Sequence, residues 1–299
     1  MLRPPATSPS GNLSEKPKLD NPNASPWDKT YLLDLFPQGV RYAPSCQVLQ
    51  LSQNQQRPNF TKLFAIQNPT NDLYYTDLEV ENILPLFPSS QVLARQDATE
   101  TAVKTNQEML VSHCHHFSCH GNFDLESPLK SALILAKDQS QEDGNLTLAE
   151  IFGLSLNQCR LVTLSACETG ITPVFGNTYE YNSDEYISLP SGFLYAGSPS
   201  VVSSLWRVNE FPTAFLMIKF YQNLSQFPTK ETGTVAIALN QAQIWLREVT
   251  KEALQEWTSH LSLTPNQKFD LSHWLRKMPP KAQPFQSPYY WAGFCAIRK

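Results

Sequence analysis

A cysteine and a histidine take similar places in two stretches of this 299-residue chain. Cys167 follows the apolar run 161–164, which is typical of a buried parallel strand, and Gly170 ends the stretch. His120 also follows a strand-like stretch and is followed directly by Gly121. Open α/β sheets place their chemistry at the carboxyl ends of parallel strands. The pattern therefore predicts that this thiol and this imidazole meet at one edge of a sheet.

A thiol beside an imidazole can act as a nucleophile. A free thiol with a pKa of about 8.5 is only a few per cent thiolate at pH 7. The imidazole can stabilise the thiolate and later protonate a leaving amine, a role that contributes ~10² to 10⁴ in rate. The pair predicts acyl transfer through a covalent intermediate. The alternative for Cys167 alone is a small buried core residue.

The stretch before His120 also offers metal-ligand side chains. These are His113, Cys114, His115, His116, Cys119 and His120. Alternation along a strand would split them between two faces, and no second Cys or His pair follows at zinc-ribbon spacing. We therefore expect no metal. His116 is predicted to make a structural hydrogen bond, and Cys114, Cys119 and Cys159 to be packed thiols.

Composition excludes several classes of function. The net charge is −4, charged residues make up 17% of the chain, and no basic block suggests a nucleic-acid binder. Six cysteines in a chain of this length do not make a disulfide scaffold. No secretion signal, membrane-spanning run or cofactor signature is visible. We expect a cytoplasmic protein with no cofactor and no nucleic-acid or membrane partner.

Strand-like and helix-like segments alternate along the chain. The expected strands are 63–66, 92–93, the His120 stretch, 131–136, the Cys167 stretch, 200–205 and 289–297. The expected helices are 44–51, 80–87, 97–105, 147–152, 189–196, 209–223 and 235–246, and the region 251–284 is helical in places. This order predicts an α/β fold with a mainly parallel central sheet of about six strands and helices on both faces. Residues 1–28 are proline-punctuated and predicted to be a linker to a domain at 29–299.

Five motifs together resemble the CHAT domain, a bacterial relative of the caspases and separases. They are His116–Gly121, Leu164–Gly170, Gly192–Gly197, Ser204–Val208 and Pro288–Phe294. The resemblance runs from about Tyr42 to the end and implies a caspase-like fold. It also implies that His120 and Cys167, which lie 47 positions apart, form a catalytic dyad. The backbone N–H groups of Gly121 and Cys167 would then form the oxyanion hole.

The residues after the strand at 200–205 bear on specificity. In caspases a similar Trp-Arg pair, here Trp206 and Arg207, lines the pocket and the arginine receives an acidic P1 side chain. In separases and many CHAT domains an acidic residue just after this strand is associated with a basic P1 residue. This sequence carries both elements, and we predict a basic P1 residue (arginine or lysine) paired with Glu210, helped by Asp184 or Glu185. The alternative for Glu210 is a helix N-terminus, which favours carboxylates.

Two functions from different classes follow. The first is a cysteine endopeptidase that cleaves a protein substrate in bacterial signalling or regulation. The second is a catalytically weak module that docks a regulatory partner, and esterase or transferase chemistry on the same pair is a third. The intact pair favours the peptidase. The resemblance also implies an upstream helical-repeat domain or partner, and the loop 171–188 is a candidate lid or self-cleavage segment.

Overall fold

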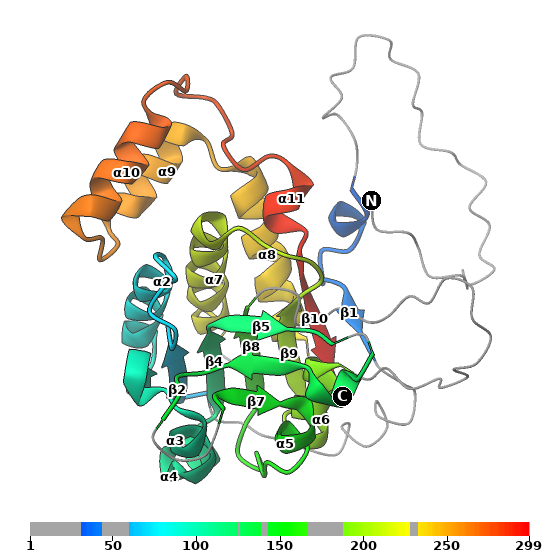
Figure 1. The fold of residues 1–299 in the computed structure, drawn as a ribbon. Coiled ribbons are helices and arrows are strands. Elements are labelled where there is room, and N and C mark those ends of the chain that lie inside the picture. The colour runs from blue at the N-terminus through cyan, green and yellow to red at the C-terminus, as the bar shows by residue number, and fades with distance from the viewer. Residues whose placement is uncertain are drawn as a thin grey trace, which may run out of the picture.

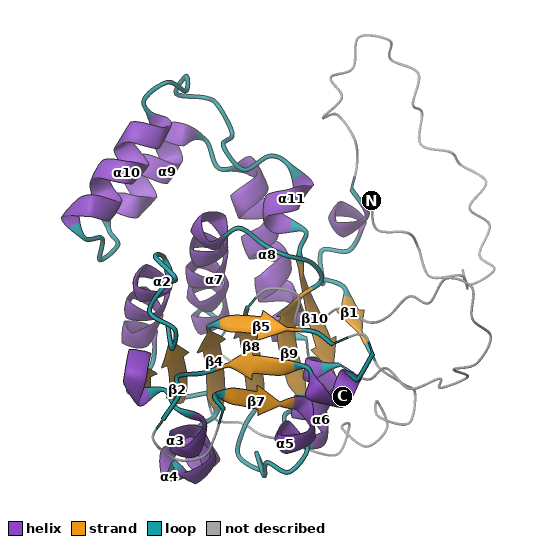
Figure 2. Cartoon of the chain, viewed as in Figure 1, coloured by secondary structure: helices purple, strands orange, loops and turns teal. Residues whose placement is uncertain are grey.

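A computed structural model describes residues 31–43, 60–124, 126–138, 143–166, 188–227 and 233–298. The predicted linker at 1–28, the helix at 44–51, nearly all of the loop 171–188 and the predicted site residues Cys167, Asp184 and Glu185 lie outside these ranges. The described chain is built around a seven-stranded sheet with helices on both faces (Figures 1 and 2).

The sheet is mainly parallel, as predicted. Its order is β1-β10-β9-β8-β4-β2-β3, and only β10 runs antiparallel to a neighbour, β9. The strands are β1 (Arg41–Tyr42), β2 (Lys62–Gln67), β3 (Ser89–Ala94), β4 (Cys114–Ser118), β8 (Leu161–Ser165), β9 (Ser200–Ser204) and β10 (Phe294–Arg298). The two-residue β1 makes the count seven instead of about six. The central β4 and β8 are buried along their whole length, which explains their nearly unbroken apolar character.

Alternate side chains of each strand enter two separate cores. On β2, Leu63 and Ala65 pack into one core, whereas Phe64 and Ile66 pack into the other. The first core is covered by α2 (Thr76–Ile83), α7 (Glu210–Ser225) and α8 (Thr234–Glu248). The second is covered by α3 (Glu100–Thr105), α4 (Gln107–Val111), α5 (Leu148–Ile151) and α6 (Leu189–Tyr195). Short 3-10 turns lie at η1 (Leu32–Leu35), η2 (Leu84–Leu86), η3 (Arg95–Asp97) and η4 (Pro128–Lys130).

The stretch before His120 is not one strand, which corrects the prediction. Asn106 caps α4 by accepting a hydrogen bond from the Glu108 backbone N–H, so the first half of the stretch is helical. Strand β4 then ends at Ser118, and His120 begins β5 (His120–Asn122). Strand β5 belongs to a small antiparallel sheet with β6 (Ala132–Ile134) and β7 (Asn145–Thr147). The histidine therefore lies just beyond the central sheet, two residues past a strand tip.

Two other predicted boundaries are wrong, and a proline explains each of them. The helix expected over 80–87 begins earlier and ends as an α-helix at Ile83, because Pro85 has no N–H to continue it. The expected last strand over 289–297 begins with α11 (Pro288–Trp291), where Pro288 suits the first helical position. The strand itself begins at Phe294.

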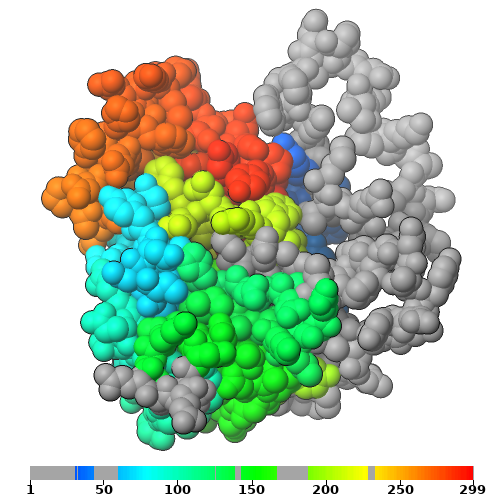
Figure 3. Space-filling model, in the orientation of Figure 1, coloured from blue at the N-terminus to red at the C-terminus, as the bar shows by residue number. Residues whose placement is uncertain are grey.

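Two further helices close the domain over the edge of the first core. They are α9 (Lys251–Ser259) and α10 (Pro265–Leu275), drawn in orange in Figure 3 next to the cyan segment that holds α2. The Tyr74 hydroxyl donates to Asp270 of α10 over 3.1 Å, and the Gln267 amide donates to the Tyr74 carbonyl over 3.5 Å. These bonds hold the loop between β2 and α2. Within the described ranges, every helix is too short or too polar to cross a lipid bilayer.

Candidate active site

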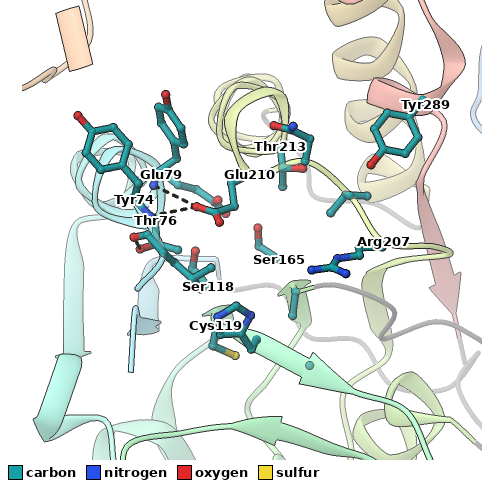
Figure 4. A pocket seen from close by; sticks show the side chains of 17 residues that line it. Tyr74, Thr76, Glu79, Ser118, Cys119, Ser165, Arg207, Glu210, Thr213 and Tyr289 are labelled. Atoms are coloured by element: carbon teal, nitrogen blue, oxygen red, sulfur yellow. Dashed lines mark hydrogen bonds between the residues drawn. The ribbon is translucent and has the colours of Figure 1, made fainter. Parts of the chain in front are cut away.

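A cavity of about 650 Å³ opens at the carboxyl ends of β4 and β8 (Figure 4). These strands are parallel neighbours, with Ser118 opposite Ser165 in register. The chain continues from Ser118 to His120 and Gly121, and from Ser165 to Ala166; all of these line the cavity. Cys167 follows Ala166 directly in the sequence and lies outside the described residues.

The predicted specificity residues divide into three groups. Arg207 and Glu210 line the cavity together with the histidine. Trp206 is not among the described lining residues, and its indole N–H donates to the Tyr289 carbonyl over 3.5 Å. Asp184 and Glu185 cannot be placed, since they fall outside the described ranges.

Asp72 holds the imidazole of His120. Nε2 of His120 lies 3.0 Å from Oδ1 and 3.2 Å from Oδ2 of Asp72, and both side chains are open to solvent, at 39% and 62% exposure. A hydrogen bond from the Thr70 hydroxyl, and more weakly the contact with His120, lower the pKa of Asp72, so this carboxyl is ionised at neutral pH. The sequence reasoning did not find Asp72. Its signal was an acidic residue in the loop just after the first buried strand.

A second histidine–carboxylate pair lies below the cavity. Nε2 of the buried His116 is 2.9 Å from Oε1 of Glu79, an ion-pair contact whose angle is not that of a hydrogen bond. Nδ1 of His116 is 3.3 Å from the Tyr221 hydroxyl, which donates to Thr163 over 2.8 Å. Because the tyrosine proton points to Thr163, Nδ1 must donate to the tyrosine oxygen. The predicted structural hydrogen bond of His116 is confirmed, whereas Glu79 was not anticipated.

The other histidines of this stretch point elsewhere. Nε2 of His115 is 2.8 Å from the Met109 carbonyl, and burial lowers the pKa of this imidazole to about 4. Nδ1 of His113 accepts from the backbone N–H of Lys62 over 3.2 Å. Each of these imidazoles therefore has a different backbone partner. Among the described residues, no group of three or more acidic, histidine or cysteine side chains is placed to share a metal ion.

Glu210 lies both at a helix N-terminus and on the cavity wall. It is the first residue of α7, after the N-cap Asn209, and it lines the cavity. Its Oε2 accepts from the backbone N–H of Tyr74 over 3.0 Å and of Tyr75 over 3.5 Å, shown as dashed lines in Figure 4. The carboxylate thus ties α7 to the β2–α2 loop across the cavity wall.

The described cysteines are packed thiols, as predicted for three of them. Cys114, Cys119, Cys159 and Cys295 are buried thiols outside any disulfide. Burial raises the pKa of Cys295 to about 12, so this thiol stays protonated at physiological pH. Cys119 also borders the cavity.

A family model decides the relationship that the motifs suggested. The CHAT domain model matches residues 18–299, nearly the whole chain. The chain belongs to the CHAT domain family. This confirms the resemblance drawn from the five motifs. No curated protein matches the sequence of this CHAT domain.

Solved structures resemble this CHAT domain at low identity. Separase of Saccharomyces cerevisiae, solved as a separase–securin complex, is 15% identical with a TM-score of 0.45, over 66% of this chain and 12% of that chain. The complex of the pro- and mature domains of Porphyromonas gingivalis RgpB is 10% identical with a TM-score of 0.47, over 84% and 52% of the two chains. A structure of the Arg-specific cysteine proteinase gingipain R is 11% identical with a TM-score of 0.45, over 89% of this chain and 52% of that chain. The chain therefore spans about an eighth of the separase chain and about half of the gingipain chains.

Proposed function

We propose that this CHAT domain is a cysteine endopeptidase with Cys167 as nucleophile and His120 as general base and acid. One observation carries the proposal: His120 and the residues immediately before Cys167 line the same cavity at the tips of two paired strands. A thiol placed there would lie beside a solvent-accessible imidazole that a carboxylate already holds.

The reaction follows from these groups. The Cys167 thiolate attacks the substrate carbonyl, and the backbone N–H groups of Gly121 and Cys167 stabilise the oxyanion. The imidazolium of His120 protonates the departing amine, which leaves a thioester on the enzyme. Water, deprotonated by the same imidazole, then hydrolyses the thioester and restores the free thiol.

Asp72 assigns the two imidazole nitrogens. It binds Nε2 of His120 over 3.0 Å, so Nδ1 is the nitrogen available to the thiol. The ionised carboxylate fixes the ring orientation and stabilises the imidazolium that forms when the thiol loses its proton. We therefore propose Asp72 as the positioning residue of the dyad.

The cavity wall supports a basic P1 residue. Glu210 faces the cavity with a carboxylate, and Asp184 or Glu185 would add negative charge from the loop that precedes α6. Arg207 is exposed at the rim, where it would contact the substrate outside the P1 pocket. A protein substrate in bacterial signalling and an upstream helical-repeat domain or partner remain part of this proposal. Residues 29–299 would form the peptidase domain.

A substrate-profiling digest tests the proposal. The wild-type protein and Cys167→Ala are incubated with a denatured proteome digest, and new peptide ends are sequenced by mass spectrometry. We expect new ends after arginine or lysine only with the wild type. Equal end formation by both proteins would contradict the peptidase and leave the docking module.

A further inference from the structure

Two carboxyl groups and one lysine join α3 to α5, away from the cavity. Glu100 is the first residue of α3, and Glu150 lies in α5, which follows β7 directly. The ammonium of Lys104 donates to Oε1 of Glu100 and to Oε1 of Glu150, each over 2.9 Å. Glu100 and Glu150 are called here the carboxyl pair. Neither of them is among the described residues that line the cavity.

Hydrogen-bond donors are divided unequally between the two carboxyl groups. Both oxygens of Glu150 are supplied, because Oε1 accepts from Lys104, and Oε2 accepts from the Thr147 backbone N–H over 2.9 Å and from its hydroxyl over 2.7 Å. Glu100 accepts from Lys104 at Oε1, whereas its Oε2 accepts no hydrogen bond from any described residue. The Glu100 side chain is only 2% exposed, so bulk water does not supply the missing donor.

A proton on Glu100 removes this imbalance. A buried carboxylate oxygen without a donor is costly, whereas a carboxylic acid carries an O–H donor of its own. The two carboxyl groups face each other as hydrogen-bond partners, which requires that one of them holds a proton. Because Glu150 already has donors at both oxygens, Glu100 is the better place for that proton.

The surrounding charges favour the same assignment. Burial and the facing Glu150 raise the pKa of Glu100 to about 7, although Lys104 opposes them. Burial would also raise the pKa of Glu150, but hydrogen bonds from Glu100, Lys104 and Thr147 lower it to about 2. Among the described residues, Asp143 is a further carboxylate that faces Glu150, from the loop before β7.

The carboxyl pair lies where the small antiparallel sheet is attached to α3. Glu150 holds Thr147 at the end of β7, and β7 pairs through β6 with β5, which begins at His120. A second attachment lies after β6, where the Ala136 N–H donates to the carbonyl of Ala98, just before α3. The position of the sheet that carries His120 therefore depends on the contact between α3 and α5.

We propose that Glu100 and Glu150 share one proton near neutral pH, and that loss of this proton loosens the small sheet that carries His120. When the Glu100 O–H releases its proton to water, two buried carboxylates are left with one ammonium between them, and they repel each other. The unfolded chain releases this proton near pH 4.5 and the folded chain near pH 7, so stability falls as pH rises between these values. This inference does not depend on the proposed peptidase function.

A carbon-13 NMR titration of the glutamate side chains tests the shared proton. The signal that disappears in Glu100→Gln is that of Glu100, and we expect it to titrate near pH 7, at least about two pH units above the exposed Glu81. Glu150→Gln keeps the capping box, where glutamine also serves, but removes the facing charge. The Glu100 midpoint should then fall by at least about one pH unit. A wild-type midpoint below about pH 5 would overturn the inference.

Urea denaturation from about pH 5 to about pH 8.5 measures the effect on stability. Glutamine at position 100 imitates the protonated acid, because its amide donates to Glu150 and accepts from Lys104. The unfolding constant of the wild type should therefore rise relative to that of Glu100→Gln by roughly 100-fold, since one unit of pKa shift is a factor of ten. The control Glu81→Gln should follow the wild type. Parallel curves for the wild type and Glu100→Gln would contradict the shared proton.

Amide hydrogen exchange locates the loosening. Peptides from β5–β7 and from the central strand β8 are compared by mass spectrometry at about pH 6.5 and about pH 8.5, after correction for the intrinsic pH dependence of exchange. We expect protection of β5–β7 to fall severalfold at the higher pH in the wild type but not in Glu100→Gln, while β8 stays protected in both.

If Glu100→Gln does not fold, Glu150→Gln makes the same comparison, because it also removes the repulsion between the two carboxylates. Unchanged protection of β5–β7 in the wild type at the two pH values would overturn the loosening, even if Glu100 titrates near pH 7. An equal loss of protection in the wild type and in the folded variant would assign the loosening to other groups and overturn it as well.

Discussion

Two histidines that are four positions apart in the sequence each pair with a carboxylate, and the two pairs have very different surroundings. His120 and Asp72 meet at the exposed mouth of the cavity, whereas His116 and Glu79 meet beneath it with almost no solvent exposure. The exposed pair can exchange protons with solvent, which the catalytic role proposed for His120 requires. The buried pair is held between Tyr221 and the sheet and suits a fixed structural role. The position of each histidine relative to the end of strand β4, and not its residue type, distinguishes the exposed pair from the buried pair.

The end of strand β4 produces this separation. His116 lies within β4, where its side chain points into the core below α2 and α7. The strand stops at Ser118, and His120 begins β5 beyond it. Because β4 ends between the two histidines of this motif, His116 is buried and His120 is partly exposed to solvent.

The largest effect is expected from a substitution that breaks the exposed pair. His120→Ala removes the general base and acid, and kcat/KM for a peptide with a basic P1 residue should fall by ~10² to 10⁴. Because His120 is solvent-exposed, the melting temperature should stay close to that of the wild type. Steady-state hydrolysis and thermal unfolding measure the two quantities. Retained hydrolysis with full stability would remove His120 from the reaction.

The next largest effect is expected from a substitution that breaks the buried pair. His116→Leu leaves the Glu79 carboxylate buried without its partner, which should lower the free energy of unfolding by ~3 to 5 kcal/mol. The double variant Glu79→Leu/His116→Leu should recover most of that loss, because no buried charge remains. Urea denaturation measures both. A single variant as stable as the wild type would show that the buried contact carries little energy.

A third histidine sharpens the comparison because its contacts in the described structure include no carboxylate. Burial lowers the pKa of His115 to about 4 from its ordinary value of 6.5. Between these pH values the unfolded chain binds a proton that the folded chain does not, so stability should fall as pH drops from about 6.5 to about 4. The expected contribution is on the order of 3 kcal/mol.

His115→Gln isolates this contribution, since glutamine keeps a donor for the Met109 carbonyl but does not titrate. Urea denaturation of both proteins at pH 7 and pH 4.5 should show a smaller loss of stability in the variant. Parallel losses in the two proteins would assign the acid sensitivity to other groups.

The smallest effect is expected from a substitution that removes the carboxylate of the exposed pair but keeps its imidazole. Asp72→Asn retains a hydrogen-bond partner for Nε2 of His120 and withdraws the negative charge. We expect hydrolysis at pH 7 to fall by roughly 3- to 30-fold, in line with a lost charged hydrogen bond at a half-exposed site. The pH–rate profile should also shift to higher pH, because less thiolate forms at neutral pH. Asp97→Asn, another exposed carboxylate change, is the matched control; an unshifted profile in Asp72→Asn would leave Asp72 without a positioning role.

The sequence predicted the sheet and its helices well because their patterns are local. Buried runs such as Leu161–Ser165 and the helix face of α8 identify themselves by periodicity. The stretch before His120 was misjudged, since an Asn106 cap and a strand break at Cys119 divide it among three elements. The two-residue β1 has too little pattern to be seen.

The site was predicted only in part because its partners are distant in sequence. His120, Gly121, Arg207 and Glu210 were identified by motif and do line the cavity. Asp72 lies 48 positions before its histidine, and no short-range pattern connects them. Glu79 occurs in a helix where a glutamate is ordinary, and only the packing of α2 over β4 buries it beside His116. Such pairings depend on tertiary contacts.

Alkylation of Cys167 by iodoacetamide tests the central claim most directly. The rate is measured from pH 5 to 9 for the wild type and His120→Ala, with each cysteine resolved by peptide mapping. If the imidazole activates the thiol, wild-type Cys167 will react rapidly even at pH 6, and His120→Ala will react only as pH approaches that of an ordinary thiol, about 8.5. Identical rates and pH dependence in the two proteins would contradict the pairing of this thiol and imidazole.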